Sequence, residues 1–245
     1  MKAVILAGGK GTRLAPYTTI LPKPLMPIGD MPILEIVIRQ LKAYGFEDIS
    51  LAVGYLAELL MAYCGDGSKF GLQVRYSREE KPLGTAGPLS LVSGLDETFL
   101  VMNGDLLTTL DYQQMYRYHR KRGAIATLAT YEREVKIDLG VLEIDEDGWV
   151  KDYIEKPTYS YSVSTGVYIF EPEVLAFIPP DERLDLPELI LNLKRRGHAV
   201  NVFRFEGYWL DIGRHDDYEL AVRMFQEHRD AFLPGENQGT QKGEH

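Results

Sequence analysis

The sequence contains a single cysteine, Cys64, among 245 residues. One thiol forms neither an internal disulfide framework nor a thiolate metal cluster, and such cysteine usage fits a reducing compartment. No apolar run approaches the length of a membrane-spanning helix, and the first residues lead into a strand rather than a signal peptide. Acidic residues exceed basic ones, 36 to 27, for a net charge of −9, which argues against nucleic acid or an anionic membrane as partner. We therefore expect a cytoplasmic protein with neither partner.

Histidine is also scarce, with five residues in the chain. They neither cluster nor pair with a serine at a catalytic spacing, which argues against a histidine metal site and a Ser–His nucleophile. We expect His119, His198 and His228 on helix surfaces or in loops, and His215 at a helix start. The chemistry must then come from lysine, arginine, carboxylate and backbone groups.

An apolar segment at residues 3–7 predicts a strand buried on both faces, as in a parallel sheet. It leads directly into a loop that contains Gly8, Gly9, Gly11, Thr12 and Arg13. Glycine permits positive φ and lets a ligand approach the main chain, and free backbone N–H groups form an anion-binding nest. Because the guanidinium of Arg13 also suits phosphate, the loop is predicted to bind the phosphates of a nucleotide, with its base as a further candidate.

Two familiar phosphate motifs do not fit this loop. The dinucleotide fingerprint G-x-G-x-x-G needs a third glycine where the chain has Leu14, and the Walker pattern needs Ser or Thr where Lys10 is followed by Gly11. A plain strand-to-helix turn would explain one or two glycines, but not three with an arginine. A nucleotide-binding loop of another kind is therefore the better interpretation.

The order of the remaining segments predicts an α/β fold with a doubly wound sheet. Expected strands follow at residues 48–53, 72–76, 99–105, 124–131, 141–144, 149–155, 164–170, 200–205 and 208–211. Expected helices lie at residues 33–44, 56–63, 112–122, 173–177, 186–195 and 215–232. The hairpin at 141–155 is antiparallel in character, so the sheet should be mixed, with the last two strands closing it.

Polar groups follow several of these strands at the edge where ligands bind. Asp105 and Asp211 each come at the end of a strand, and carboxylate oxygens there suit magnesium. The alternative for Asp105 is a turn or helix cap, but Asp111 is better placed as the cap. Lys23 lies between two prolines that hold it at a defined place, either to meet a phosphate or as an idle surface residue. This inventory suits phosphoryl or nucleotidyl transfer.

At this point the sequence resembles the sugar-1-phosphate nucleotidyltransferases, the NDP-sugar pyrophosphorylases, from Lys2 to about Tyr218. The resemblance is carried by Leu6-Ala7-Gly8-Gly9-x-Gly11-Thr12-Arg13-Leu14, Pro22-Lys23-Pro24, Gly84-Thr85-Ala86-Gly87, Asn103-Gly104-Asp105, Glu155-Lys156-Pro157 and Trp209-Leu210-Asp211-Ile212-Gly213. It implies a Rossmann-like, GT-A-like domain of three α/β/α layers over residues 1–234. The polar residues 235–245 are expected to form a disordered tail.

The resemblance also implies roles for individual residues. Nucleotide binding would involve Leu6, Ala7, Gly8, Gly9, Gly11, Thr12, Arg13, Gly84 and Thr85. The sugar phosphate would be bound by Gly140, Glu155, Lys156 and Thr165. Arg13, Lys23 and Asp105 would be catalytic, and Asp105 with Asp211 would hold Mg²⁺. The substrates would be an NTP and a sugar 1-phosphate, and the family's habit implies a homodimer or homotetramer.

The choice of substrates rests on finer features. The loop from Gly84 to Leu89 most resembles mannose-1-phosphate guanylyltransferases, which favours GTP with a mannose-like sugar 1-phosphate. Ser164-Thr165-Gly166 is closer to the thymidylyltransferases, so a dTTP- or UTP-dependent glucose-1-phosphate enzyme is the alternative. A non-catalytic, NDP-sugar-binding regulatory homologue and a glycosyltransferase are the other candidates, although the chain lacks the Asp-x-Asp motif that a glycosyltransferase needs.

Overall fold

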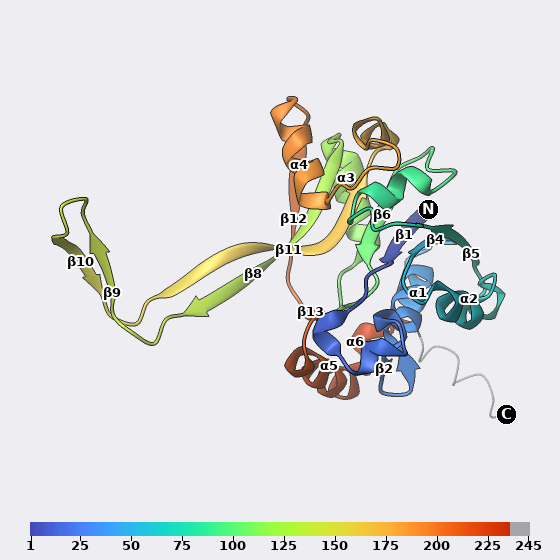
Figure 1. Cartoon of the computed structure of the whole chain (residues 1–245), viewed down its shortest axis with the longest axis horizontal. Helices are drawn as coiled ribbons and strands as arrows, with labels where there is room; N and C mark the ends of the chain where they lie inside the picture. The colour runs from blue at the N-terminus through green and yellow to red at the C-terminus, as the bar shows by residue number, and fades with distance from the viewer. Residues whose placement is uncertain (236–245) are drawn as a thin grey trace.

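The computed structural model describes residues 1–235, in which one seven-stranded sheet forms the centre (Figure 1). In spatial order its strands are β12 (Val200–Phe205), β8 (Ala126–Lys136), β11 (Thr158–Phe170), β6 (Phe99–Asn103), β1 (Lys2–Ala7), β4 (Asp48–Val53) and β5 (Gln73–Arg78). The neighbouring strands pair in parallel, except that β11 is antiparallel to β6 and β8. The predicted mixed sheet is confirmed.

Helices and short elements surround this sheet. The helices are α1 (Ile33–Ala43), α2 (Ala57–Cys64), α3 (Tyr112–Arg122), α4 (Leu186–Arg195), α5 (His215–Glu227) and α6 (Arg229–Phe232). The 3₁₀ turns are η1 (Thr12–Leu14), η2 (Tyr17–Thr19), η3 (Lys23–Leu25), η4 (Ser68–Phe70), η5 (Gly87–Leu91) and η6 (Pro172–Phe177). Three two-stranded pairs complete the set, namely β2 (Pro27–Ile28) with β3 (Met31–Pro32), β7 (Leu106–Thr108) with β13 (Trp209–Asp211), and β9 (Val141–Ile144) with β10 (Val150–Ile154).

The sheet is buried on both faces, as its apolar strands require. Along β1, Ile5 belongs to a core shared with α1, α3 and α5, while Val4 belongs to a second core shared with η5, η6 and α4. Because successive side chains of a strand point to opposite faces, the sheet lies between two helical layers. This is the predicted three-layer α/β/α arrangement.

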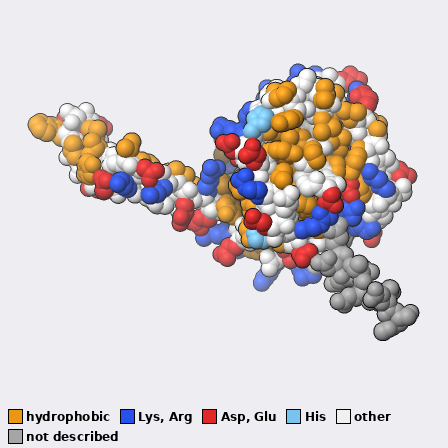
Figure 2. Space-filling model, turned by 90° about the horizontal axis from the view of Figure 1, so that it is seen from below, with side chains coloured by type: hydrophobic (Ala, Val, Ile, Leu, Met, Phe, Trp, Pro, Cys, Tyr) orange, Lys and Arg blue, Asp and Glu red, His pale blue; other side chains and the backbone are white. Residues whose placement is uncertain are grey.

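A long arm leaves this body. We define the arm as residues 132–163, which comprise the outer halves of β8 and β11 together with the β9–β10 hairpin (Figure 1). No residue from 132 to 163 is buried, and the space-filling view shows the arm standing clear of the body, with apolar side chains along it (Figure 2). The prediction gave the hairpin but not the ribbon that carries it away, since it ended one strand near Tyr131 and began the other near Ser164.

The C-terminal part differs from the prediction in two places. The last predicted strand does not join the main sheet, because the chain turns at Gly207, where φ is +148°, and β13 then pairs with β7 instead. The predicted helix 215–232 is two helices, with a break at His228, whose φ is −130°. Pairing of β13 with β7 brings Asp211 opposite Leu106, the residue after Asp105.

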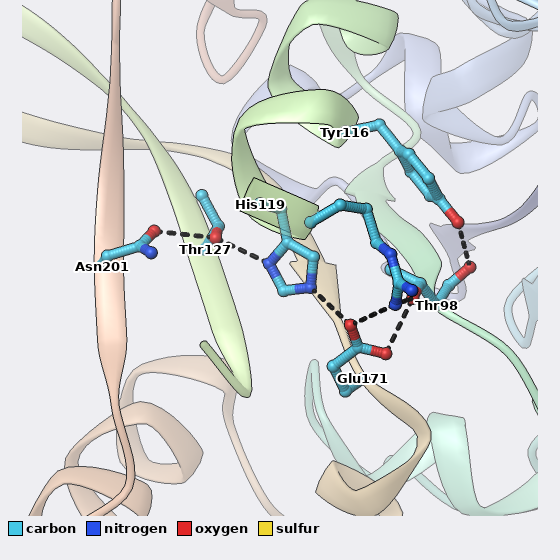
Figure 3. Close-up of polar contacts among 7 residues, drawn as sticks. Thr98, Tyr116, His119, Thr127, Glu171 and Asn201 are labelled. Carbon is cyan, nitrogen blue, oxygen red and sulfur yellow. Dashed lines mark hydrogen bonds and ion pairs between the residues drawn. The ribbon is translucent and has the colours of Figure 1, made fainter. Parts of the chain in front are cut away.

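The expectation for His119 was also wrong, because its ring is fully buried beneath α3 (Figure 3). Tyr112, Met115 and His119 follow each other at helical spacing along the buried face of α3. Nδ1 of His119 lies 2.7 Å from the hydroxyl oxygen of Thr127, and Nε2 lies 3.3 Å from a carboxylate oxygen of Glu171. Burial lowers the pKa of His119, and the network ties α3 to β8 and to the end of β11.

Two expectations concern the chain as a whole. Within residues 1–235, no helix is both long enough and apolar enough to cross a bilayer. The tail predicted for 235–245 lies, apart from its first residue, outside the described residues. The assignment of 1–234 to one catalytic domain stays a prediction.

Candidate functional site

A cleft of about 1250 Å³ opens at the carboxyl ends of β1, β4 and β6. Its walls include the first glycine loop, the end of β5 and the loop at residues 80–88, together with Lys23, Asn103 and Asp105. This is the edge of an open α/β sheet where ligands bind. Every residue predicted to bind the nucleotide lines this one cleft, namely Leu6, Ala7, Gly8, Gly9, Gly11, Thr12, Arg13, Gly84 and Thr85.

The first glycine loop is shaped by two close approaches and one left-handed residue. Gly11 has φ +59° and starts the turn that presents Arg13. A Cβ on Gly8 would lie 2.5 Å from a carboxylate oxygen of Glu79, so a larger residue there would displace that side chain. The guanidinium of Arg13 lies over Gly213, where a Cβ would be 3.3 Å from Nη2. The loop therefore offers open backbone and one fixed cation to a ligand.

The second glycine loop is held from below by the start of α4. Gly84 has φ +79°, and a Cβ there would lie 2.6 Å from the carbonyl oxygen of Leu184. The amide of Thr85 donates to a carboxylate oxygen of Asp185 at 3.1 Å, and its hydroxyl accepts from the amide of Leu186 at 2.7 Å. The side chain of Thr85 is thus occupied in anchoring the loop, which leaves the backbone to face the cleft.

The two predicted aspartates lie side by side, each next to Lys23. The amide of Ile212 donates to the carbonyl oxygen of Asp105 at 3.2 Å, which joins the two strand ends. Lys23 forms an ion pair with Asp105 and its Nζ lies 3.9 Å from Asp211. The lysine begins the 3₁₀ turn η3, and its side chain is only 9% exposed.

The electrostatics of this cluster suit a divalent cation. Burial, together with the neighbouring negative charge of Asp105, raises the pKa of Asp211. One carboxylate oxygen of Asp105, Oδ1, is buried and has no hydrogen-bond partner among residues 1–235. Magnesium prefers hard oxygen ligands, usually one or two carboxylates together with phosphate oxygens and waters. A pair of carboxylates with an unused oxygen fits that donor set, and no group of three or more His, Cys, Asp or Glu suited to a metal occurs in the described chain.

The predicted sugar-phosphate residues are not brought to this cleft within one chain. Gly140, Glu155 and Lys156 lie on the arm, and none of them lines the cleft. Thr165 is buried inside the sheet, where its hydroxyl donates to the carbonyl oxygen of Ala129 at 3.0 Å. Their predicted role stays a prediction, but a single copy does not assemble it.

Some residues of the cleft were missed by the sequence reasoning. Glu79 extends from the end of β5, accepts a hydrogen bond from the amide of Leu83 at 2.9 Å and stands against Gly8 and Gly54. Tyr55 and Asn103 also line the cleft. The available signal was position, because Tyr55 and Glu79 come within three residues after a predicted parallel strand and Asn103 lies near the end of another.

Comparisons with known proteins agree with this geometry. A protein-family model described as "Nucleotidyl transferase" matches residues 2–228. The UTP–glucose-1-phosphate uridylyltransferase of Synechocystis sp. is 37% identical over 257 residues, which cover 96% of this chain and 66% of the relative. The mannose-1-phosphate guanylyltransferase catalytic subunit beta of Drosophila pseudoobscura pseudoobscura is 34% identical over 231 residues, covering 91% of this chain and 62% of the relative. The chain thus spans just under two-thirds of the length of these curated relatives.

A solved structure gives the same result for the fold. HddC from Yersinia pseudotuberculosis, complexed with GMP-PN, superposes with a TM-score of 0.70 at 27% identity. The match covers 91% of this chain and 99% of that one. The similarity therefore extends over most of the chain.

Proposed function

The chain belongs to the nucleotidyl transferase family, and from this premise we propose that it transfers a nucleoside monophosphate from an NTP to a sugar 1-phosphate, releasing pyrophosphate. The observation that carries the proposal is the convergence of a glycine nest, Lys23 and two aspartates on one cleft. Phosphoryl-type transfers need positioned positive charge more than covalent help from the protein. The cleft offers that combination.

The reaction would be an in-line displacement. An oxygen of the sugar 1-phosphate forms a bond to the α-phosphorus of the NTP, and the bond to the β-phosphate oxygen breaks to release pyrophosphate. The attacking phosphate is already anionic, so no side chain has to remove a proton. Arg13 would bind the triphosphate, and Lys23 would stabilise the charge that rises on the α-phosphate.

Asp105 and Asp211 would hold a magnesium ion, which when bound neutralises charge on the phosphate oxygens. Within the cleft Lys23 partly neutralises the same two carboxylates. Lysine and aspartates therefore form one charge cluster, in which the ammonium keeps the carboxylates together and remains next to the phosphate site.

GTP with a mannose-like sugar 1-phosphate is the substrate pair that we propose first. Support comes from the guanylyltransferase-like second glycine loop and from two relatives, the guanylyltransferase subunit and the GMP-PN complex. The carboxylate of Glu79 adds a feature of the cleft, because a carboxylate accepts hydrogen bonds and guanine carries an N2 amino donor that uracil and thymine lack.

The 37% identity with a uridylyltransferase favours a second candidate, a UTP- or dTTP-dependent enzyme acting on glucose 1-phosphate. A grid of five NTPs against several sugar 1-phosphates, with and without Mg²⁺, separates the two by kcat/KM for pyrophosphate release. The highest value for GTP with mannose 1-phosphate supports the first candidate, and UTP or dTTP with glucose 1-phosphate supports the second. Binding of NDP-sugar without turnover would indicate a regulatory homologue, and release of free NDP a glycosyltransferase.

A further inference from the structure

The arm is an unusual structure for a lone molecule. Outside the body, Thr158 to Ser162 of β11 pair with Lys136 to Glu132 of β8, beyond the last residue that β12 pairs with, so no third described strand flanks them. This part of the ribbon extends about 16 Å at about 3.3 Å per residue. An isolated two-stranded ribbon has little stability of its own in water, so a surface that covers the arm would stabilise it.

The side chains of the arm indicate that something covers it. Several large apolar residues are more than two-fifths exposed, namely Val135, Leu139, Leu142, Ile144, Trp149, Val150, Tyr153 and Tyr161. Trp149 and Leu139 are each 74% exposed. Figure 2 shows apolar side chains, in orange, along the arm and at its tip. Contiguous exposed apolar surface of this kind marks an interaction site rather than solvated surface.

The arm also carries an ordered polar cluster at the root of its hairpin. The hydroxyl of Tyr153 donates to Glu155 at 3.3 Å and lies against Gly140, where a Cβ would collide with it. Lys156 has φ +47°, which is strained for a residue with a side chain, and its Nζ lies 3.8 Å from Glu155. Strained backbone of this type occurs at ligand-binding sites. The cluster is nevertheless open to solvent, because the side chains of Glu155 and Lys156 are 61% and 58% exposed.

The cleft, in turn, lacks the residues that were predicted to bind the sugar phosphate. It holds the nucleotide-side groups, while the residues predicted for the sugar phosphate are on the arm. The charges match, because residues 132–163 carry nine acidic and four basic side chains, whereas the cleft is lined by five basic and three acidic ones. Tyr17 and Ile20 are 55% and 79% exposed on the segment that Tyr55 ties to the cleft wall, so apolar surface is available beside it.

We infer that the arm of one copy docks on the cleft of a second copy, so that Glu155 and Lys156 of each chain complete the sugar-phosphate site of the other. In a two-fold dimer the same contact occurs twice, so that each arm lies on the cleft of the other chain. The inference rests on the proposed function, which defines what the cluster binds. The exposed apolar residues of the arm would then be covered by the partner, and each of the two sites would be shared.

The test is complementation between two inactive variants. Asp105→Asn disables the cleft and Lys156→Ala disables the arm, and the latter residue is 58% exposed, so its loss leaves folding intact. The two chains are co-expressed with different tags, and the heterodimer is isolated by sequential purification. It should release pyrophosphate at about half the wild-type rate, because one of its two sites has an intact cleft and an intact arm, while each parent dimer has less than about a hundredth.

A heterodimer as inactive as its parents would overturn the inference, since the arm would then bend near the irregularity in register between Ser164 and Tyr168 of β11 and serve its own cleft. Full activity of Lys156→Ala alone would overturn it too. Wild-type protein that releases no pyrophosphate with any substrate pair contradicts the proposed function itself, and the inference with it. Active wild-type protein with an inactive heterodimer contradicts the exchange of arms only.

A second readout does not depend on catalysis. Wild-type protein should be a dimer by light scattering, and Ile144→Ser with Trp149→Ser on the arm should make it a monomer whose body still unfolds in a cooperative thermal transition. The matched control is Leu191→Ser on α4, a similarly exposed apolar residue far from the arm in the chain, which should stay dimeric. A monomeric wild-type protein, or a double variant that stays dimeric, would contradict the docking.

Discussion

Replacement of Lys23 by methionine removes the ammonium that pairs with Asp105 and lies close to Asp211, while keeping most of the side-chain volume. The side chain is 9% exposed, and that of its partner Asp105 is 23% exposed. Breaking a fully buried ion pair costs about 3–5 kcal/mol. Since both aspartates retain contact with water, and the exposed fraction of the Asp211 side chain is 47%, we expect about 1–3 kcal/mol here. For a chain of this size the melting temperature should fall by about 3–9 °C.

The effect on catalysis should be larger. A positioned group that stabilises charge in the transition state contributes about 100- to 1,000-fold to kcat. Lys23→Met should therefore lower kcat by that factor at 25 °C, where the variant is still folded. Pyrophosphate release at saturating NTP and Mg²⁺ measures it, alongside calorimetry for stability.

Adding Asp105→Asn separates the two effects. With one opposing charge gone, the double variant should recover about 1 kcal/mol or more of the stability lost in Lys23→Met, but none of the activity. Lys194→Met, on the exposed face of α4, is the control and should match wild type in both assays. The reasoning is refuted if the loss of activity in Lys23→Met only equals its unfolded fraction, or if Asp105→Asn restores no stability.

Further predictions follow from the same geometry. Because the pKa of Asp211 is raised, its ionised form lowers the stability of the fold above the ordinary pKa of an aspartate. Asp211→Asn should therefore raise the metal-free melting temperature at pH 7 by up to about 2 °C while abolishing turnover. A fall in melting temperature would contradict the crowding of the two carboxylates. Gly84→Ala should lower the free energy of unfolding by about 2 kcal/mol or more and raise KM for the NTP. Gly123→Ala, also at positive φ but facing open space, should lower it by about 1 kcal/mol. Equal urea midpoints for the two variants would disprove the contact with Leu184. Burial lowers the pKa of His119, so the unfolded chain binds protons first as the pH falls below about 6.5 and stability drops there. In His119→Gln the urea midpoint should fall less between pH 7.5 and 5.5 than it does in wild type. If it falls as much as in wild type, other groups cause the loss of stability at acid pH.

The sequence by itself determined the body of the fold and the nucleotide side of the cleft. Residues 3–7 and 99–102 are apolar runs typical of a doubly buried strand, and parallel strands end at a common edge. The loops after them therefore had to meet, and Gly8, Arg13 and Asp105 do line one cleft. These signals are local, since they depend on composition and spacing within a few residues of the site.

Other features were determined only by the tertiary structure. Asp211 lies beside Asp105 because β13 pairs with β7 over about a hundred residues of sequence, and the chain around Gly207 carries no local mark of which strand it will join. His119 had a signal in the spacing of Tyr112 and Met115, but a basic last turn on α3 concealed it.

The arm shows the same division between local pattern and long-range pairing. Strands were predicted at residues 124–131 and 164–170, on either side of the hairpin at 141–155. The length of the β8–β11 ribbon, however, is set by pairing across its two strands, and its path by the irregularity in register between Ser164 and Tyr168. Local pattern thus gave the groups on each side of the reaction, while the pairing of distant strands decided that Gly140, Glu155 and Lys156 stand away from the cleft of their own chain.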